Sequence, residues 1–236
     1  MNAQPIPAST DPRDVPSYGI NEAAHYLRLP KATLRSWVLG RYYDTDDGRK
    51  FWPPLVEIAD RDGRLLSFMN LVEAHVLGAM RQGYEVPLPK ARTAINCLKN
   101  KLAVAHPLAT QRFETNGTDL FVNKYGQLIN ASQDGQLAMR ELLRAHLRRI
   151  EWDEEGLARR LFPFIRSRQA DEPKFIVIDP RVSYGRPVLV GTGIATSVIA
   201  ERYKAGESMD ALANDYDRRR SEIEEAIRCE LEVKAA

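Results

Sequence analysis

Four polar side chains near the amino end have the types and spacing to bind nucleic acid: Lys31, Thr33, Arg35 and Ser36. Cations neutralise phosphates and short hydroxyl groups reach base edges, so such a set can contact a DNA major groove. Leu34 and Val38 fall at helical spacing within residues 31–39 and leave these polar side chains on other faces of a helix. The spacing alone is equally compatible with an ordinary helical hairpin whose charged face is solvated.

The segments on either side determine how this helix is presented. Residues 21–27 have the apolar spacing of a first short helix, and Leu29 and Pro30 separate it from the second. Together they predict a helix-turn-helix. Residues 41–50, which follow Gly40, are predicted to be a polar loop.

A second basic feature is expected just beyond that loop. Residues 55–58 and 64–67 have the character of short strands around a turn at 60–63, and such a hairpin is a wing. Its cations, Arg61 and Arg64, are candidates for phosphate contact, although a salt bridge on the hairpin is the alternative for Arg64. Ser67 is expected to cap an apolar helix at 68–80 that covers the helix pair.

These segments resemble the DNA-binding domain of the MerR group of winged helix-turn-helix proteins. The resemblance covers residues 18–80 and rests on I-N-E-A-A-H-Y-L, K-A-T-L-R-S-W and G-R-L-L-S-F-M-N-L. It implies phosphate contact by Arg35 and by Arg64 or Arg61, with Lys31, Thr33 and Ser36 nearest the bases. The chain departs from MerR sensors because no long dimerising coiled coil follows.

The middle of the chain combines an expected sheet with a basic helix. Residues 111–130 alternate apolar and polar side chains around Asn116-Gly117 and Tyr125-Gly126, which predicts a small antiparallel sheet. Residues 136–150 are predicted to be helical. Arginines recur along this helix and at the start of the next linker. They are candidates for contact with an acidic partner or nucleic acid, or for cations that lie over the helix surface: Arg140, Arg144, Arg148, Arg149 and Arg166.

The last part of the chain, residues 171–236, predicts a compact unit of three helices behind two short strands. The motifs I-D-P, G-R-P-V, G-T-G-I, A-G-E-S-M-D-A-L-A and D-Y resemble those of domain-of-unknown-function family 433, whose members are similar to VapB-class antitoxins found beside PIN-type ribonuclease toxins. One departure is Gly193, which stands where the family usually has arginine. A MerR-like domain before this unit resembles the longer mycobacterial type of VapB antitoxin.

Composition limits the other classes of function. The net charge of +2 means that any DNA site is a local patch, and 44% hydrophobic residues can bury a core. No apolar run approaches the roughly 20 residues of a membrane span, and no leader is evident, so the cytoplasm is the expected location. Cys97 and Cys229 have no metal-binding spacing. Gly191-Thr192-Gly193 lacks the residues of a phosphate-binding loop.

The prediction is therefore a mainly α chain with small antiparallel β elements (α+β), without catalytic residues, metal or cofactor. The expected parts are a flexible arm (1–16), a winged helix-turn-helix domain (17–106), a central β-hairpin and helical segment (107–170) and a family 433 domain (171–236). The resemblance implies an antitoxin that binds operator DNA and a PIN-type ribonuclease toxin, as a homodimer or higher oligomer. Arg140, Arg144, Arg148, Arg149 and Arg166, with Arg218 to Arg220, form the hypothetical toxin-facing set. A stand-alone transcription regulator and a recombination accessory protein remain alternatives.

Overall fold

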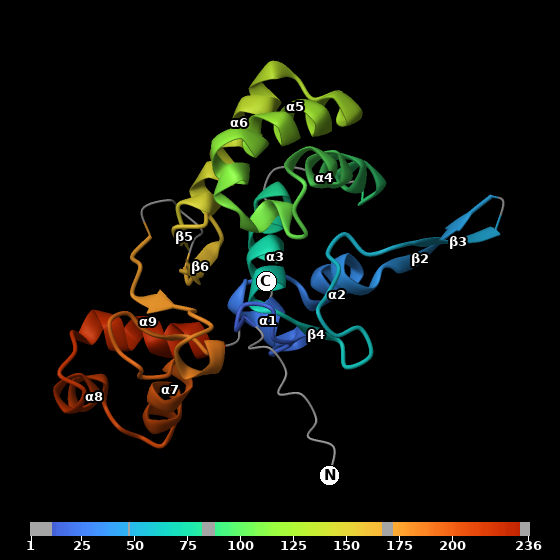
Figure 1. Cartoon of the computed structure of the whole chain (residues 1–236). Coiled ribbons are helices and arrows are strands. Elements are labelled where there is room, and N and C mark those ends of the chain that lie inside the picture. The colour runs from blue at the N-terminus through green and yellow to red at the C-terminus, as the bar shows by residue number, and fades with distance from the viewer. Residues whose placement is uncertain (1–10, 47, 82–87, 167–171, 232–236) are drawn as a thin grey trace, which may run out of the picture.

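Helices dominate the structure, and its strands form small antiparallel pairs, as the sequence predicts (Figure 1). The computed structural model describes residues 11–46, 48–81, 88–166 and 172–231. The helices of the amino-terminal body are α1 (Ile20–Tyr26), α2 (Lys31–Leu39), α3 (Phe68–Arg81), α4 (Leu88–Leu102), η1 (Pro107–Ala109), the π-helical η2 (Phe113–Gly117), α5 (Thr118–Ile129) and α6 (Gln133–Leu147). Those of the carboxyl-terminal unit are η3 (Ser183–Gly185), α7 (Thr196–Lys204), α8 (Met209–Asp215) and α9 (Arg220–Glu230).

The described strands pair locally in four two-stranded sheets. These pairs are β1 (Tyr18–Gly19) with β4 (Leu65–Leu66), β2 (Arg41–Thr45) with β3 (Gly48–Trp52), β5 (Ile150–Trp152) with β6 (Ala158–Leu161), and β7 (Ile176–Val177) with β8 (Val188–Leu189). None is long enough to form a layer of its own, so helix packing builds the core.

Helix α3 lies at the centre of the amino-terminal body, with α1 and α2 on one side and α4 to α6 on the other (Figure 1). Ser67 caps it as predicted, because its Oγ accepts from the Asn70 amide at 3.3 Å. Its described side chains are buried on every face, including Leu71 and Val72 at 0% exposure. One apolar cluster extends through this body from Tyr18 to Leu161 and also includes Ile178.

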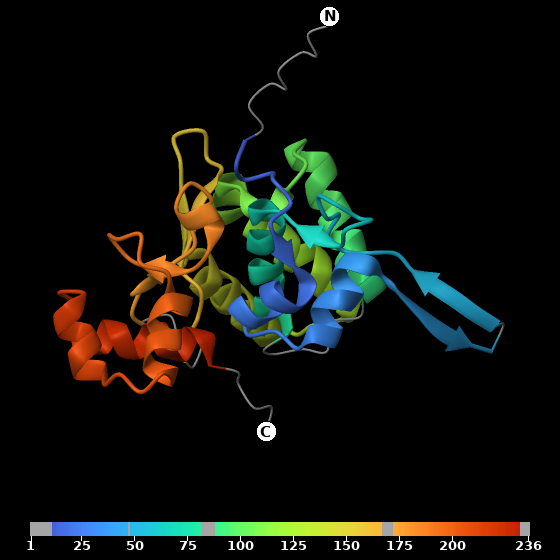
Figure 2. The same cartoon turned by 90° about the horizontal axis from the view of Figure 1, so that it is seen from below.

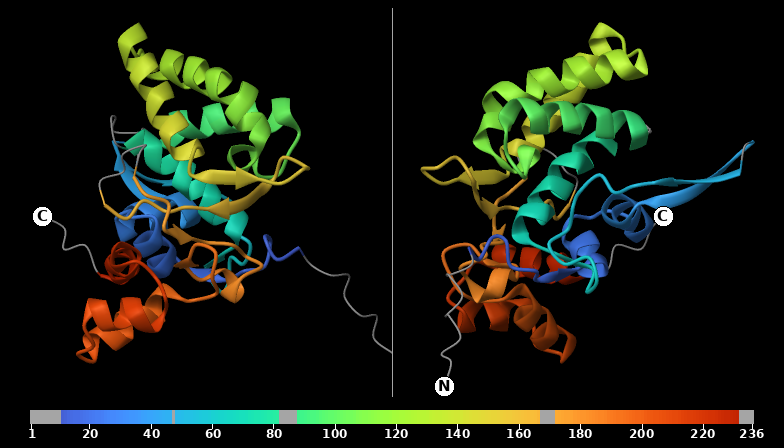
Figure 3. Two further views of the ribbon diagram at one scale, coloured as in Figure 1. Left: turned by 90° about the vertical axis from the view of Figure 1, so that its left-hand side faces the viewer. Right: turned by 45° about the vertical axis from the view of Figure 1, so that its right-hand side comes forward.

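The segment after α2 differs from the predicted polar loop. Residues 41–45 and 48–52 pair as the hairpin β2–β3, which projects away from the body (Figures 1 and 2, and the right view of Figure 3). The predicted wing is shorter than expected: residues 55–58 form no strand, while Asp60 and Leu65 make an isolated bridge around the turn at 61–64. Leu65–Leu66 continues into β4 and pairs with β1.

The predicted central sheet at 111–130 is wrong, because this segment is helical through η2 and α5. The two glycines that suggested turns serve close packing instead. A Cβ at Gly117 would lie 2.8 Å from the Phe113 ring, and one at Gly126 would lie 2.8 Å from the Gln136 side chain. The hairpin of this region is β5–β6, after α6.

The carboxyl-terminal unit packs α7, α8 and α9 around its own apolar cluster, with Ile199, Leu212 and Ile223 each at 0% exposure. Ser208 caps α8 as predicted, since its Oγ accepts from the Ala211 amide at 3.1 Å. Helix α9 begins earlier than predicted, at Arg220, because Glu222 accepts from the Arg219 amide at 3.0 Å. This unit lies beside α1 (Figures 1 and 2).

Candidate nucleic-acid interface

Helices α1 and α2 form the predicted helix-turn-helix, with α2 held by an apolar face. Leu34, Trp37 and Val38 are at most 4% exposed, whereas Lys31 and Arg35, beside this buried face, are exposed. An α-helix repeats every ~3.6 residues, so burying one face of α2 necessarily turns the other outward. The buried leucine and tryptophan therefore fix which side chains α2 offers to a ligand.

A hollow of about 460 Å³ lies between α2, the start of α1 and the wing turn, and is lined by Gly19, Ile20, Asn21, Glu22, Lys31, Ala32, Arg35, Gly63 and Arg64. It brings together three predicted DNA-binding residues from two separate elements. Arg64 has a left-handed backbone (φ 55°), and the turn before it is closed because Gly63 donates its amide to Asp60 Oδ1 at 2.9 Å. This turn directs the wing toward α2.

The charges in this hollow favour an anion. Within the described residues, Lys31, Arg35 and Arg64 form no ion pair. The one acid lining the hollow, Glu22, is neutralised by Arg186 from the carboxyl-terminal unit and also accepts from the Tyr26 hydroxyl at 3.0 Å. The salt-bridge alternative for Arg64 therefore has no support in this part of the structure.

The other predicted DNA-binding residues lie elsewhere or are less accessible. Thr33 and Ser36 are half-buried, and the Ser36 hydroxyl donates to the Thr33 carbonyl at 2.9 Å. Arg61 is exposed but lines a different hollow, on the far side of the wing loop. The structure thus gathers Lys31, Arg35 and Arg64, and leaves Arg61 apart from them.

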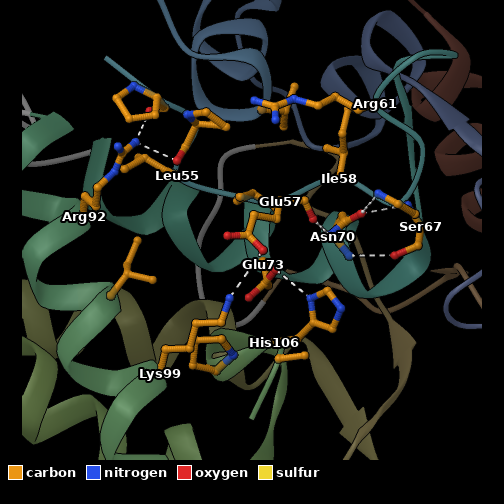
Figure 4. A pocket seen from close by; sticks show the side chains of 18 of the residues that line it. Leu55, Glu57, Ile58, Arg61, Ser67, Asn70, Glu73, Arg92, Lys99 and His106 are labelled. Carbon is orange, nitrogen blue, oxygen red and sulfur yellow. Dashed lines mark hydrogen bonds and ion pairs between the residues drawn. The ribbon is translucent and has the colours of Figure 1, made fainter. Parts of the chain in front are cut away.

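That second hollow, of about 840 Å³, separates the wing loop from α4 (Figure 4). Its walls are joined across the gap: Lys99 pairs with Glu57 at 3.4 Å, and Arg92 donates to the carbonyls of Pro53 and Pro54. At its back, His106 pairs with Glu73 at 2.9 Å. The charged groups that bridge this hollow, and those at its back, are therefore already paired with protein atoms.

Asn70 on α3 fixes the wing loop in position. Its Oδ1 accepts from the amides of Ala59 and Ser67 at 3.0 and 3.1 Å, and its Nδ2 donates to the Glu57 carbonyl at 2.9 Å. Asn70 is 0% exposed. A side chain buried in the central helix thus determines where the wing, and with it Arg64, is held.

Of the five predicted toxin-facing arginines, two are exposed without an ion pair, two are paired with acids, and one is buried. Arg144 and Arg148 are exposed and form no ion pair within the described residues. Arg140 is paired with Asp119 at 2.6 Å, and Arg166 with the buried Glu225 at 2.7 Å. The alternative cations are also paired: Arg218 and Arg219 with Glu222, and Arg220 with Asp210.

Arg149 does not belong to this surface, because its side chain is 1% exposed. Its guanidinium donates to carbonyls of the segments that follow α6, at Phe162 (2.9 Å), Glu172 (2.5 Å), Pro163 (3.0 Å) and Pro173 (3.3 Å). Burial lowers its pKa, and the charges of Glu172 and Glu225 oppose that effect. The prediction that Arg149 contacts a partner directly is therefore wrong.

Sequence reasoning missed the hairpin β2–β3. A signal was present, because Tyr42-Tyr43 and Phe51-Trp52 enclose a polar stretch that contains Asp47-Gly48, and an Asp-Gly dipeptide is a turn signal. The many charged residues around this turn signal favoured a polar loop instead.

The described residues contain no cluster of side chains that could hold a metal ion. Gly191-Thr192-Gly193 is a turn closed by its own threonine, whose hydroxyl donates to the Leu189 carbonyl at 2.8 Å. Cys97 and Cys229 are free thiols. In the part of the chain that the structure describes, no helix has the length and apolarity to span a bilayer.

Comparisons with known proteins agree with this geometry. Residues 16–95 match the family model described as "Putative DNA-binding HTH domain", and residues 176–228 match "Protein of unknown function (DUF433)". The chain is 29% identical over 231 residues to "Putative antitoxin VapB45" of Mycobacterium tuberculosis, covering 91% of this chain and 93% of that protein. It is 27% identical over 223 residues to "Uncharacterized protein Rv2308" of the same organism, covering 89% and 88%.

The crystal structure of Rv2018 from Mycobacterium tuberculosis has a similar fold, with a TM-score of 0.65 and 24% identity over 90% of this chain and 98% of that one. The chain thus combines a helix-turn-helix domain of the family described as putative DNA-binding with a domain of unknown-function family 433, in an arrangement that resembles a named putative antitoxin along nearly its whole length.

Proposed function

We propose that this protein is an antitoxin that binds operator DNA through α2 and the wing, and that neutralises a PIN-type ribonuclease toxin by direct contact. The observation that carries the DNA-binding half is the convergence of Lys31, Arg35 and Arg64 on one hollow without ion pairs in the described structure. The similarity to a protein named a putative antitoxin supports the other half. The same proposal includes that the helix-turn-helix domain is of the MerR type.

In this mechanism α2 enters the major groove and the wing follows the neighbouring backbone. Arg35 and Arg64 neutralise phosphates and fix the orientation of the protein, and Lys31 lies nearest the bases. Thr33 and Ser36 contribute less than the sequence suggested, because both are half-buried. Arg61 lies outside the hollow that holds Lys31, Arg35 and Arg64, so it contacts the DNA backbone only if the DNA extends past the wing.

The substitution Arg35→Ala tests the DNA-binding proposal. Binding of DNA from the operon's own promoter is measured by fluorescence anisotropy over a series of salt concentrations. Because each phosphate contact releases counterions, we expect weaker binding and a salt slope that is smaller by about one unit. Arg159→Ala removes an exposed cation on β6, outside the hollow, and is the matched control. An unchanged slope for Arg35→Ala would remove α2 from the interface.

The toxin-binding proposal rests on Arg144, in the last turn of α6, and Arg148, the residue that caps this helix; they lie four positions apart and both are exposed. Arginine forms bidentate pairs with carboxylates, and the resemblance implies a toxin whose active site holds acidic residues. These arginines would occupy that site in competition with its metal.

Co-expression with the product of the adjacent reading frame tests this half. We expect arrest of growth by that product alone, rescue by the intact chain, and a complex that co-purifies. Arg144→Glu/Arg148→Glu should lose rescue, whereas Arg140→Ala, which removes an arginine already paired with Asp119, should keep it. Rescue by the double variant would refute the assignment of the interface.

A stand-alone transcription regulator is the second candidate, and the helix-turn-helix alone favours it. It predicts operator binding that depends on Arg35 and an adjacent reading frame whose product arrests nothing. The two experiments above therefore separate the candidates.

A further inference from the structure

The turn η3 of the carboxyl-terminal unit holds three successive residues in the left-handed conformation. The φ angles are 47° at Ser183, 54° at Tyr184 and 75° at Gly185. Only glycine adopts this conformation without a steric cost, so a serine and a tyrosine in succession are strained there. Tyr184 is also 93% exposed, the most of any large apolar side chain in the part of the chain that the structure describes. A strained residue that buries nothing is a candidate for function rather than for stability.

Hydrogen bonds from both units hold this turn in place. The Arg186 amide donates to the Ser183 carbonyl at 3.0 Å, and the Ser183 hydroxyl donates to the Gly193 carbonyl at 3.2 Å. From the amino-terminal body, the Tyr18 hydroxyl donates to the Gly185 carbonyl at 2.9 Å. The turn therefore presents its tyrosine from a fixed backbone, which reduces the conformational entropy that is lost when a ligand binds.

Arg186 directly follows the turn and reaches the edge of the hollow between α1, α2 and the wing. Its Nη1 pairs with Oε1 of Glu22, and Glu22 lines that hollow. Among the described residues, Nε and Nη2 of Arg186 have no hydrogen-bond partner, and the side chain is 43% exposed. A guanidinium that a carboxylate holds by one nitrogen keeps its other donors available for a second anion.

The segment around the turn contains no acid that would repel such an anion. Residues 180–200 include two arginines and neither aspartate nor glutamate. Two acids beside this segment are already paired, Asp179 with Arg160 at 2.9 Å and Asp11 with Arg13 at 2.6 Å. An exposed tyrosine hydroxyl next to an arginine with free donors is therefore suited to phosphate groups.

The place of the turn in the fold favours the DNA backbone as the source of those phosphates. In a helix-turn-helix the second helix enters the major groove and the first helix crosses the backbone. The carboxyl-terminal unit lies beside α1 (Figure 2), and Arg186 and Gly185 contact it and the strand before it through Glu22 and Tyr18. The turn thus continues the candidate DNA interface along the helix that is expected to cross the backbone.

We propose that η3 and Arg186 form a third DNA-contacting element, which the carboxyl-terminal unit adds to α2 and the wing. Arg186, oriented by Glu22, binds one backbone phosphate, and the Tyr184 hydroxyl donates to a neighbouring phosphate. Both contacts position the protein on the duplex and read no base. The inference rests on the DNA binding proposed above and extends it to the family 433 unit.

Anisotropy titrations of the full chain with DNA from the operon's promoter, repeated over a series of salt concentrations, test both contacts. Arg186→Ala should weaken binding by at least about fivefold and lower the salt slope by about one unit, because one phosphate contact is lost. Tyr184→Phe should weaken binding by about threefold at an unchanged slope, since a neutral hydroxyl displaces no counterion. Its effect cannot come from misfolding, because the ring lies in solvent.

Matched controls remove the same groups elsewhere. Arg159→Ala deletes an exposed cation on β6, and Tyr203→Phe deletes the hydroxyl of a tyrosine on α7 that is 39% exposed. Neither substitution should change the affinity or the salt slope.

The variant Glu22→Gln separates a direct contact by Arg186 from simple neutralisation of Glu22. If Arg186 binds a phosphate, Arg186→Ala lowers the salt slope by about one unit in the Glu22→Gln chain, as it does in the wild type. If Arg186 only neutralises Glu22, adding Arg186→Ala to Glu22→Gln changes nothing, and the proposal is overturned.

Wild-type DNA binding by either Arg186→Ala or Tyr184→Phe would also overturn the proposal. If these variants keep DNA binding but lose rescue from the toxin, the turn belongs to the toxin interface instead. A wild-type chain that binds no promoter DNA would refute the proposed function itself. Binding that depends on Arg35 but not on Arg186 or Tyr184 would refute only this inference.

Discussion

Arg149 and Arg148 are neighbours in sequence with opposite environments. Arg148 is exposed at the end of α6, whereas Arg149 turns inward and donates to backbone carbonyls on both sides of the connection to the carboxyl-terminal unit. Its guanidinium carbon lies over the Phe164 ring, 5.0 Å from the ring centroid. The arginine thus gathers segments that have few regular hydrogen bonds of their own.

Arg149→Ala should lower the free energy of unfolding by about 3 kcal/mol, because the deletion leaves several buried carbonyls without donors. Urea denaturation monitored by circular dichroism measures the change. Arg148→Ala, the matched control, should remain within about 0.5 kcal/mol of the wild type. Equal effects of the two substitutions would contradict the structural role given to Arg149.

At the scale of elements, His106 joins the segment before η1 to α3 through Glu73 (Figure 4). Burial disfavours the charged imidazolium, but the hydrogen bond and charge of Glu73, helped by Asp14, outweigh burial and the nearby Lys99, so the pKa of His106 is raised. A raised pKa in the folded state means that the folded protein binds this proton more tightly than the unfolded chain does.

The stability from this pair is therefore fully present below the ordinary histidine pKa of about 6.5 and is lost as pH rises through the folded value. His106→Gln should cost more stability at pH values below that point than at clearly alkaline pH. Unfolding free energies of both proteins across this range test the prediction. A cost independent of pH would mean that the pair contributes no charge interaction.

Elements of the fold differed in how far sequence could predict them. Helices with a clear apolar stripe, such as α3 and α6, and the capped α8 were predicted because their signals are local. The region 113–129 was not, since Gly117 and Gly126 look like turn residues and are required instead by the Phe113 and Gln136 side chains that pack on them. Such contacts arise only once the helices are packed.

The candidate site was predictable in part for the same reason. The residues of α2 follow from helical spacing, but the hollow that unites Lys31 and Arg35 with Arg64 depends on the turn at 60–63 and on Asn70. Nothing local in the sequence separates the exposed Arg148 from the buried Arg149. Their difference follows from where α6 ends and the chain turns inward.

At the scale of the whole molecule, the carboxyl-terminal unit contacts the start of the helix-turn-helix. The Tyr18 hydroxyl donates to the Gly185 carbonyl at 2.9 Å, and burial raises the pKa of this hydroxyl, which keeps it protonated. Arg186 pairs with Glu22 beside the candidate DNA site. A partner that shifts this unit would therefore also alter the charge of the DNA-binding hollow.

Gly185→Ala should weaken this junction. Gly185 has a left-handed backbone (φ 75°), and a Cβ there would overlap the Tyr18 hydroxyl. The combined strain and lost hydrogen bond should cost about 2 kcal/mol and also reduce DNA affinity. Thermal unfolding and anisotropy measure the two effects.

Gly193→Ala is the matched control, because a Cβ at Gly193 would meet nothing within 4 Å. Gly193→Arg, which restores the residue usual in family 433, should be accommodated equally well. Loss of stability in either Gly193 variant, or none in Gly185→Ala, would contradict this account of the junction.

Arg28 follows α1, and its guanidinium donates to the carbonyls of Arg228, Cys229 and Leu231 at the end of α9. The last helix of one unit is thus terminated by a residue of the other. The two units are consequently not freely interchangeable modules. A chimera made by grafting a relative's carboxyl-terminal unit onto this chain would need a matching residue at position 28, so successful recombination must exchange the two surfaces together.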